Sequence, residues 1–313
     1  MHWEMLYREV SNMEKAKEEV SKMPECPNYN DCAFPVSMHT ITKYDIFPNG
    51  RGFHDVHWHD EIQFTYVSKG ELTMQVEGRE YVLKEGEALF INSGLIHVTT
   101  SISEDGQYEG FMFPEKLLGF FPGSRMEQNY VLPYLKSNVL SVCVLYRESA
   151  EDEKILSDIR NLRELFNNKE NVTAFEYEVA VRMTAIWLQI VRNVSDTMQK
   201  MPACYLQRQE RMKKMMQYIV EHYHEAITLK EIAESASISI EECRRCFKDI
   251  IKETPMHYLS SYRVMVGMEL LRTTDLDITD IAFRVGFNDS SYFIQAFKKK
   301  NGMTPKQYRN HIF

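Results

Sequence analysis

The C-terminal third of this 313-residue chain contains one sequence pattern twice. Ile232-Ala233 recurs as Ile281-Ala282 at an offset of 49 residues, whereas Phe247-Lys248 and Thr254-Pro255 recur at an offset of 50. The additional residue falls between the two helices that we expect in the second copy. A period of this length is typical of a repeated supersecondary unit, and the apolar spacing in each copy predicts a helix, a short turn and a second helix.

The residues at the expected helix ends agree with this prediction. Thr228-x-x-Glu231 and Ser239-x-x-Glu242 are capping boxes, in which side chains bind the free backbone N–H groups at the start of a helix. Gly286 supplies the positive φ that a tight turn between helices needs, and Ser237 stands at that place in the first copy. Thr254-Pro255 places a capping Thr before a Pro at the first helical position.

The second helix of each unit has an apolar face and a polar face. Cys243, Cys246 and Phe247 share one stripe with Ile250, so we expect the two cysteines to be structural rather than redox-active or zinc-binding. A helix, a short turn and a second helix form a helix-turn-helix unit, whose second helix can enter the major groove of DNA. The polar residues expected to contact DNA are Glu241, Arg244, Arg245 and Lys248 in the first unit and Ser290, Ser291, Ile294, Gln295, Lys298 and Lys299 in the second. Arg suits guanine, Gln suits adenine, Glu accepts from cytosine and Ile touches a thymine methyl group. Lys298, Lys299 and Lys300 are expected to contact phosphate groups of the DNA backbone.

Residues 229–308 resemble the AraC/XylS-type transcription regulators. The motifs that carry the resemblance are Gly286-Phe287, Ser291-Tyr292-Phe293, Phe297-Lys298 and Gly302-Met303-Thr304-Pro305. The resemblance implies that Glu241, Arg244 and Arg245 read bases in the first unit and that Ser290, Ser291, Ile294 and Gln295 do so in the second. It also implies double-stranded promoter DNA as a partner, with RNA polymerase as a further candidate. Two such units can enter successive major grooves about 34 Å apart.

Charge is divided unevenly along the chain. Residues 208–313 contain 17 Lys and Arg against 14 Asp and Glu, whereas residues 1–207 contain 20 against 31, for a total charge of −8. This asymmetry favours a protein that meets DNA with its C-terminal part only. Six scattered cysteines argue against a disulfide framework, and the sequence contains neither a membrane span nor a signal peptide. We therefore expect a cytoplasmic protein without a membrane partner.

The composition along the chain predicts five regions. Residues 1–35 form a short helix and an arm, and residues 36–150 form a β-domain with a turn at Glu77-Gly78. Residues 151–194 form a helical hairpin, which either packs on the β-domain or joins two subunits in a homodimer. Residues 195–207 form a linker, and residues 208–313 form the DNA-binding domain. The expected fold class is α+β and multidomain, with a cupin-like antiparallel β-barrel followed by an all-α double helix-turn-helix.

The β-domain contains a group of histidines at cupin-like spacing. In a strand His57, His59, Glu61 and Gln63 point to one side, and His97 ends a later Gly-led strand pair. The pattern resembles a metal-binding cupin, with Gln63 in place of the expected Glu and Asn92 in place of a Pro. The three histidines His57, His59 and His97 are candidate ligands for a divalent metal. Alternatively, they line a small-molecule pocket, and the candidate effector-binding residues are His57, His59, Glu61, Gln63, Tyr81 and His97.

Two function classes remain. The first is a transcription regulator, an activator or a repressor, that responds to a small-molecule effector such as a sugar and requires no cofactor. The second is a metal-dependent cupin enzyme or a metal-responsive regulator that uses His57, His59 and His97. No acid/base pair or nucleophile accompanies the histidines at a readable spacing, so we expect no enzyme activity and no catalytic residues.

Overall fold

The computed structural model describes residues 34–43, 46–47, 55–135, 140–194 and 203–312. The helix and arm predicted for residues 1–35 lie almost wholly outside these described residues. The strands are β1 (Ser37–Thr42), β2 (Ile46–Phe47), β3 (Ile62–Lys69), β4 (Glu71–Val76), β5 (Arg79–Lys84), β6 (Ala88–Ile91), β7 (His97–Ile102), β8 (Gln107–Phe113) and β9 (Val142–Leu145). No helix within the described ranges is long and apolar enough to cross a membrane.

The helices follow the β-strands along the chain. The short helices are α2 (Lys116–Gly119), the π-helix η1 (Glu127–Val131), α3 (Leu132–Leu135) and the 3-10 helix η2 (Lys169–Asn171). The long hairpin consists of α4 (Asp152–Asn167) and α5 (Phe175–Val194). The C-terminal helices are α6 (Ala203–His222), α7 (Leu229–Ser235), α8 (Ile240–Ile250), α9 (Pro255–Thr273), α10 (Ile278–Arg284), α11 (Ser290–Asn301) and α12 (Pro305–Ile312).

The β-domain consists of two antiparallel sheets that lie face to face. One sheet has the order β2-β1-β8-β3-β6-β9 and the other has the order β5-β4-β7. The cupin-like antiparallel fold is confirmed, but the sheets are open where we expected a closed barrel. The reason is that β3 is hydrogen-bonded by β6 on one side and by β8 on the other. The following strand β4 cannot pair with it, and the chain crosses to the second sheet at Gly70, which has a φ of +74°.

Alternating residues of β3 separate two apolar cores. Val67 faces the second sheet and packs with Leu72 and Met74 between the two sheets. Phe64 faces the opposite way and packs with the hairpin α4–α5, whose buried side chains include Ile159 and Met183. The predicted amphipathic helices are therefore confirmed, and their apolar stripes cover the β-domain. The turn at Glu77-Gly78 is also confirmed, with positive φ at both residues as a two-residue hairpin turn requires.

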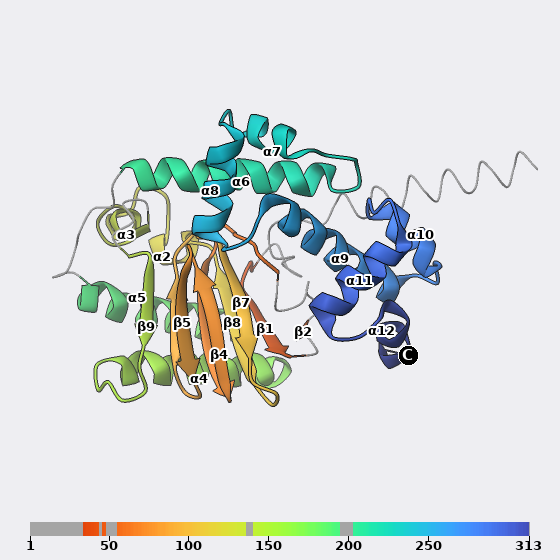
Figure 1. Ribbon diagram of the computed structural model, residues 1–313. Helices are drawn as coiled ribbons and strands as arrows, with labels where there is room; N and C mark the ends of the chain where they lie inside the picture. The colour runs from red at the N-terminus through yellow and green to blue at the C-terminus, as the bar shows by residue number, and fades with distance from the viewer. Residues whose placement is uncertain (1–33, 44–45, 48–54, 136–139, 195–202, 313) are drawn as a thin grey trace, which may run out of the picture.

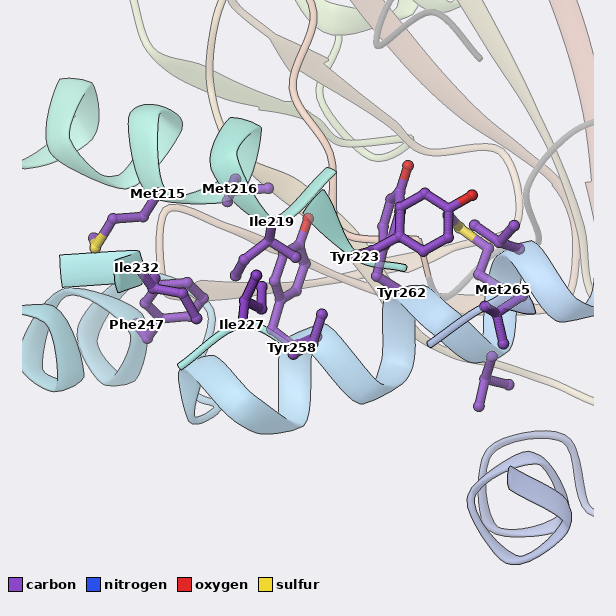
Figure 2. Packing of buried hydrophobic residues seen from close by; sticks show 14 of the residues in the cluster. Met215, Met216, Ile219, Tyr223, Ile227, Ile232, Phe247, Tyr258, Tyr262 and Met265 are labelled. Atoms are coloured by element: carbon purple, nitrogen blue, oxygen red, sulfur yellow. The ribbon is translucent and has the colours of Figure 1, made fainter. Parts of the chain in front are cut away.

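The C-terminal helices share a third core. Figure 2 shows Met215, Ile219, Phe247 and Tyr258 meeting at the centre of α6, α7, α8 and α9. In Figure 1, α8 lies above the ends of β4 and β5, and α9 leads across to α10, α11 and α12. Helix α6 begins at Ala203, so residues 203–207 of the predicted linker are helical.

The two copies of the repeat have matching backbones. Ile238 N donates to Ala233 O over 3.1 Å, and Phe287 N donates to Ala282 O over 2.9 Å at the equivalent turn. Gly286 has the expected positive φ of +89°, and Ser237 adopts +55° without being a glycine. The capping box at Thr228 is confirmed. At Ser239 the hydroxyl caps the helix, but the carboxylate of Glu242 pairs with arginines and leaves the box incomplete.

Candidate functional site

Helix α8 presents the predicted polar face to solvent. Ser239 caps its first turn by accepting from Glu242 N over 3.2 Å. The apolar stripe is buried as predicted, and it consists of Cys243, Cys246, Phe247 and Ile250. The side chains predicted to contact DNA are all exposed, and they are Glu241, Arg244, Arg245 and Lys248. Burial raises the pKa of the Cys243 thiol to about 11, so this cysteine behaves as a small apolar side chain.

Ion pairs hold three arginine side chains at α8, of which Arg245 is exposed. Arg245 pairs with Glu242, and Glu242 also lies 3.7 Å from Arg211 on α6. Arg208 lies 3.0 Å from Asp249 at the end of α8. Exposed ion pairs contribute little to stability, about 0 to 1 kcal/mol each. Arg245 can therefore exchange its carboxylate partner for a base edge or a phosphate at low cost.

Helix α11 presents the second polar face. Asp289 caps it by accepting from Ser291 N over 2.7 Å. Among the predicted DNA contacts, the exposed residues are Ser291, Gln295, Lys298 and Lys299, whereas Ser290 and Ile294 are half-buried. The phosphate contact expected for Lys300 is wrong. Its Nζ donates to Ser261 O over 3.3 Å, and burial lowers its pKa.

Arg263 joins the two units. This α9 side chain donates to Tyr223 O over 2.7 Å and to Glu225 O over 2.6 Å, and so binds carbonyls near the end of α6. Its guanidinium also lies 5.8 Å from the centre of the Phe287 ring, next to the turn of the second unit. One side chain thus fixes the first unit, the connecting helix and the second turn relative to one another.

Three histidines meet between the two sheets. The ring centres of His57 and His97 are 4.4 Å apart, and His59 lies 5.8 Å from His57 and 5.1 Å from His97. One ring nitrogen from each residue lies within 4.8 Å of the others. The continuous strand predicted through residues 57–63 is wrong, because β3 begins only at Ile62. A single bridge between His57 and His97 brings the rings together instead.

Backbone carbonyls determine which nitrogen of each ring carries the proton. Nδ1 lies 2.9 Å from Asp55 O in His57, 3.1 Å from Glu61 O in His59 and 2.8 Å from Leu95 O in His97. A carbonyl oxygen only accepts, so Nδ1 donates in all three rings and Nε2 keeps its lone pair. Nε2 of His97 is buried and has no hydrogen-bond partner among the residues that the structure describes.

Gln63 is the fourth polar group at this cluster. Its Oε1 lies 2.9 Å from His59 Nε2, and its Nε2 donates to Thr65 Oγ1 over 2.8 Å. With the proton of His59 on Nδ1, the first contact places two acceptors opposite each other. A shared cation relieves this repulsion, as does a 180° rotation of the amide. Gln63 can therefore act as a hydrogen-bond donor or, through Oε1, as a fourth metal ligand.

The remaining two candidate effector-binding residues, Glu61 and Tyr81, differ in their distance from the cluster. Glu61 Oε2 is 3.6 Å from His59 Nδ1 and makes no hydrogen bond with the described residues, so the backbone carbonyl of Glu61, rather than its carboxylate, orients the ring. Tyr81 is on β5, which strand β4 separates from the strand of His97. His39 on β1 is close enough to lower the pKa of His59, and its distance of 20 residues from His59 in the sequence gives no sign of this contact.

Burial favours the neutral form of His59 and His97. Burial and the neighbouring His57 lower the pKa of His59 to about 4. Burial, His57 and His59 lower the pKa of His97 well below its usual value. Neutral imidazoles at neutral pH are the form that binds metal ions.

Comparisons with known proteins match both halves of the chain to domain families. Residues 232–311 match the helix-turn-helix domain family, and residues 44–107 match the cupin domain family. The chain is 30% identical over 287 residues to the "uncharacterized HTH-type transcriptional regulator YdeC" of Bacillus subtilis, which covers 92% of this chain and 96% of that protein. It is 22% identical to the melibiose operon regulatory protein of Escherichia coli, over 81% of this chain and 82% of that protein.

Two further proteins match this chain, one over about a third of its length and one over most of it. The HTH-type transcriptional activator RhaS of an Enterobacter species is 32% identical over 99 residues, which are 32% of this chain and 36% of that protein. A crystal structure of ToxT from Vibrio cholerae covers 91% of this chain and 100% of its own, with 13% identity and a TM-score of 0.48.

Proposed function

The chain belongs to the AraC-type transcriptional regulators, and from this premise we propose that α8 and α11 read promoter DNA while the three-histidine cluster receives the signal. The observation that carries the proposal is the pair of recognition helices, each with a buried apolar face and an exposed polar face, held on one connecting helix. Arg244, Arg245 and Gln295 then read bases, and Lys298 and Lys299 bind phosphates.

Anisotropy titrations test the DNA-binding part. Labelled duplexes from the upstream region of the gene for this chain are compared with shuffled duplexes of equal composition at several salt concentrations. We expect tighter binding of the upstream duplex at every salt concentration, with log K falling linearly with log salt for both duplexes. Equal affinity for both duplexes, with folded protein, contradicts the proposal.

For the signal we propose a divalent transition-metal ion rather than a sugar-like effector. The support comes from the donor set. It consists of three imidazoles with Nδ1 held by carbonyls, the buried Nε2 of His97, which has no hydrogen-bond partner in the described part of the chain, and the amide oxygen of Gln63. Imidazole ligands favour zinc, copper, iron or nickel over magnesium and calcium. A bound ion of this kind would be held by His57, His59 and His97.

Thermal denaturation distinguishes these ligands. An ion at 100 times its Kd stabilises the folded chain by about 2.7 kcal/mol. We expect Zn²⁺ or Ni²⁺ to raise the melting temperature, Mg²⁺ and sugars to leave it unchanged, and His97→Ala to remove the effect. His224→Ala is the matched control because His224 is exposed on the C-terminal part. A shift with sugars only, retained in His97→Ala, contradicts the metal site.

We further propose that α5 forms a homodimer contact. Its inner face covers the β-domain, but Tyr177, Val181 and Leu188 are 79%, 62% and 46% exposed and share the outer face of the helix. An exposed apolar stripe of this kind is typical of an interface. Sedimentation should show a dimer that Val181→Glu dissociates and that Val82→Glu, at an exposed valine of β5, leaves intact.

A further inference from the structure

Residues 56–60 have two faces. His57 and His59 point to the cluster between the sheets, whereas Val56 and Trp58 pack against the core of the C-terminal helices. Consecutive side chains of an extended segment point in opposite directions, so each ligand residue has a neighbour on the helical side. We call residues 56–60 the coupling segment.

The backbone of the coupling segment is fixed on the cluster side. His57 N donates to His97 O over 3.1 Å, and His97 N donates to His57 O over 2.9 Å. His59 O accepts from Gly94 N over 2.7 Å. Trp58 lies between these two attachments, so a displacement of the histidine backbones displaces Trp58 as well.

The helical side of the segment meets α6 and α9. Lys213 of α6 places Nζ 4.5 Å from the centre of the Trp58 ring, and a Cβ added at Gly94 would lie 2.6 Å from the same Nζ. Tyr258 of α9 donates its hydroxyl to Val56 O over 3.5 Å. Burial lowers the pKa of Lys213, and the carboxylates of Asp60 and Glu77 act in the opposite direction. The ammonium group is thus enclosed between the two domains.

A second contact joins the same helical unit to the β-domain. Gln75 Nε2 donates to Ile250 O over 3.1 Å at the end of α8. At the β4–β5 turn, a Cβ added at Gly78 would lie 2.0 Å from Asp249 O. Figure 1 shows the end of α8 directly above this hairpin. The β-domain therefore contacts α6, α8 and α9, which are the first helix-turn-helix unit and its flanking helices.

We propose that the coupling segment transmits occupation of the three-histidine cluster to the first helix-turn-helix unit through Trp58 and Lys213. This inference rests on the proposed metal-responsive function. An ion that draws the rings of His57, His59 and His97 to one point moves the backbone on both sides of Trp58. The indole then changes its contact with α6, and the position of the first helix-turn-helix unit relative to the β-domain changes with it.

The test measures metal content and DNA affinity separately on the full chain. Zn²⁺ uptake is determined by equilibrium dialysis, and the Kd for the upstream duplex is determined with and without Zn²⁺. We expect Zn²⁺ to change the Kd of the unmodified protein about 5-fold or more, which is the lower end of ordinary allosteric coupling. Trp58→Ala should still take up Zn²⁺ but change its Kd less than about 2-fold.

Two further variants complete the design. Lys213→Met keeps most of the apolar stem, removes the ammonium group, and should also reduce the response, so the test survives if Trp58→Ala does not fold. Tyr146→Ala changes an exposed aromatic residue after β9 and should keep the full response.

Each outcome has one meaning. A full DNA response in zinc-loaded Trp58→Ala and Lys213→Met overturns the inference and leaves the metal site intact. If the unmodified protein takes up zinc and its Kd for DNA does not change, the inference is also overturned and the metal site stands. Absence of zinc uptake in the unmodified protein refutes the metal site and overturns the inference with it, and the dialysis measurement identifies that case.

Discussion

Gly267 of α9 lies so close to Phe293 of α11 that an added Cβ would be 2.8 Å from Cε2 and 2.9 Å from Cζ of the ring. Phe293 is fully buried and opposes the predicted base-reading face of α11. The absence of a side chain at Gly267 therefore sets the distance between the connecting helix and the second recognition helix.

Gly267→Ala should destabilise the chain by about 1 kcal/mol, because overpacking costs about 1 to 3 kcal/mol and the gain in helix propensity offsets about 1 kcal/mol. Binding of the upstream duplex should weaken as well, because α11 is displaced. Urea denaturation and anisotropy measure the two effects. The double variant with Phe293→Leu should recover part of both losses, and a double variant with additive losses contradicts the steric explanation.

A comparison of two glycines tests the turn of the second unit. Gly286 and Gly302 both have positive φ, +89° and +72°. A Cβ at Gly286 would lie 2.6 Å from Tyr223 O, whereas Gly302 has nothing within 4 Å of that position. Gly302→Ala should cost about 1 kcal/mol from backbone strain alone, and Gly286→Ala should cost about 3 kcal/mol or more. Equal losses in urea denaturation would show that the contact with Tyr223 is unimportant.

Arg245 and Lys299 should differ in the kind of DNA binding that they support. Arg245→Ala should weaken binding of the upstream duplex by about 1 to 3 kcal/mol and relax the preference at one base position. Lys299→Ala should weaken all duplexes alike and reduce the salt slope by about one unit. Anisotropy with single-base variants of the duplex separates the two. Equal losses of Arg245→Ala on upstream and shuffled DNA contradict its assignment as a base reader.

The histidine cluster should make the metal-free chain sensitive to mild acid. Above pH 6.5 His59 is neutral both in the folded and in the unfolded chain. Between pH 6.5 and about 4 the unfolded chain binds a proton that folded His59 does not, so stability falls as pH falls. The full loss from His59 is about 3 kcal/mol, and His97 adds to it in the same direction.

Urea denaturation at pH 7.5 and at pH 5 in the presence of a chelator measures this dependence. His59→Asn should flatten the decline, whereas His224→Asn, at an exposed histidine, should leave it unchanged. A chain with equal stability at both pH values would show that His59 is protonated in the fold.

The local parts of this fold could be predicted from the sequence. The Thr228 capping box, the turn at Glu77-Gly78 and the buried stripe through Cys243 depend on residues a few positions apart, and local geometry determines them. Even the alternation of His57 and His59 with Trp58 was predicted correctly, although the segment is not a strand.

Long-range contacts account for what the sequence did not predict. Lys300 follows two exposed lysines, but it turns inward to the carbonyl of Ser261 on α9 and towards the carboxylates of Asp55 and Glu253, which are distant in the sequence. Glu61 shares a side with Gln63 in an ideal strand, but the chain before β3 is irregular and places its carboxylate behind His59. The contact of Trp58 with Lys213 depends on how two domains pack, and neither periodicity nor composition specifies that packing.

The alternation in residues 56–60 also bears on how such a regulator can diversify. Residues 57 and 59 face the cluster and residues 56 and 58 pack against the helices, so different side chains make the two sets of contacts. Under the coupling proposed above, single substitutions at residues 57 and 59 would change the ligand and leave the connection to the helical domain in place. On that proposal, ligand recognition and the response of the helical domain can evolve separately within a stretch of five amino acids.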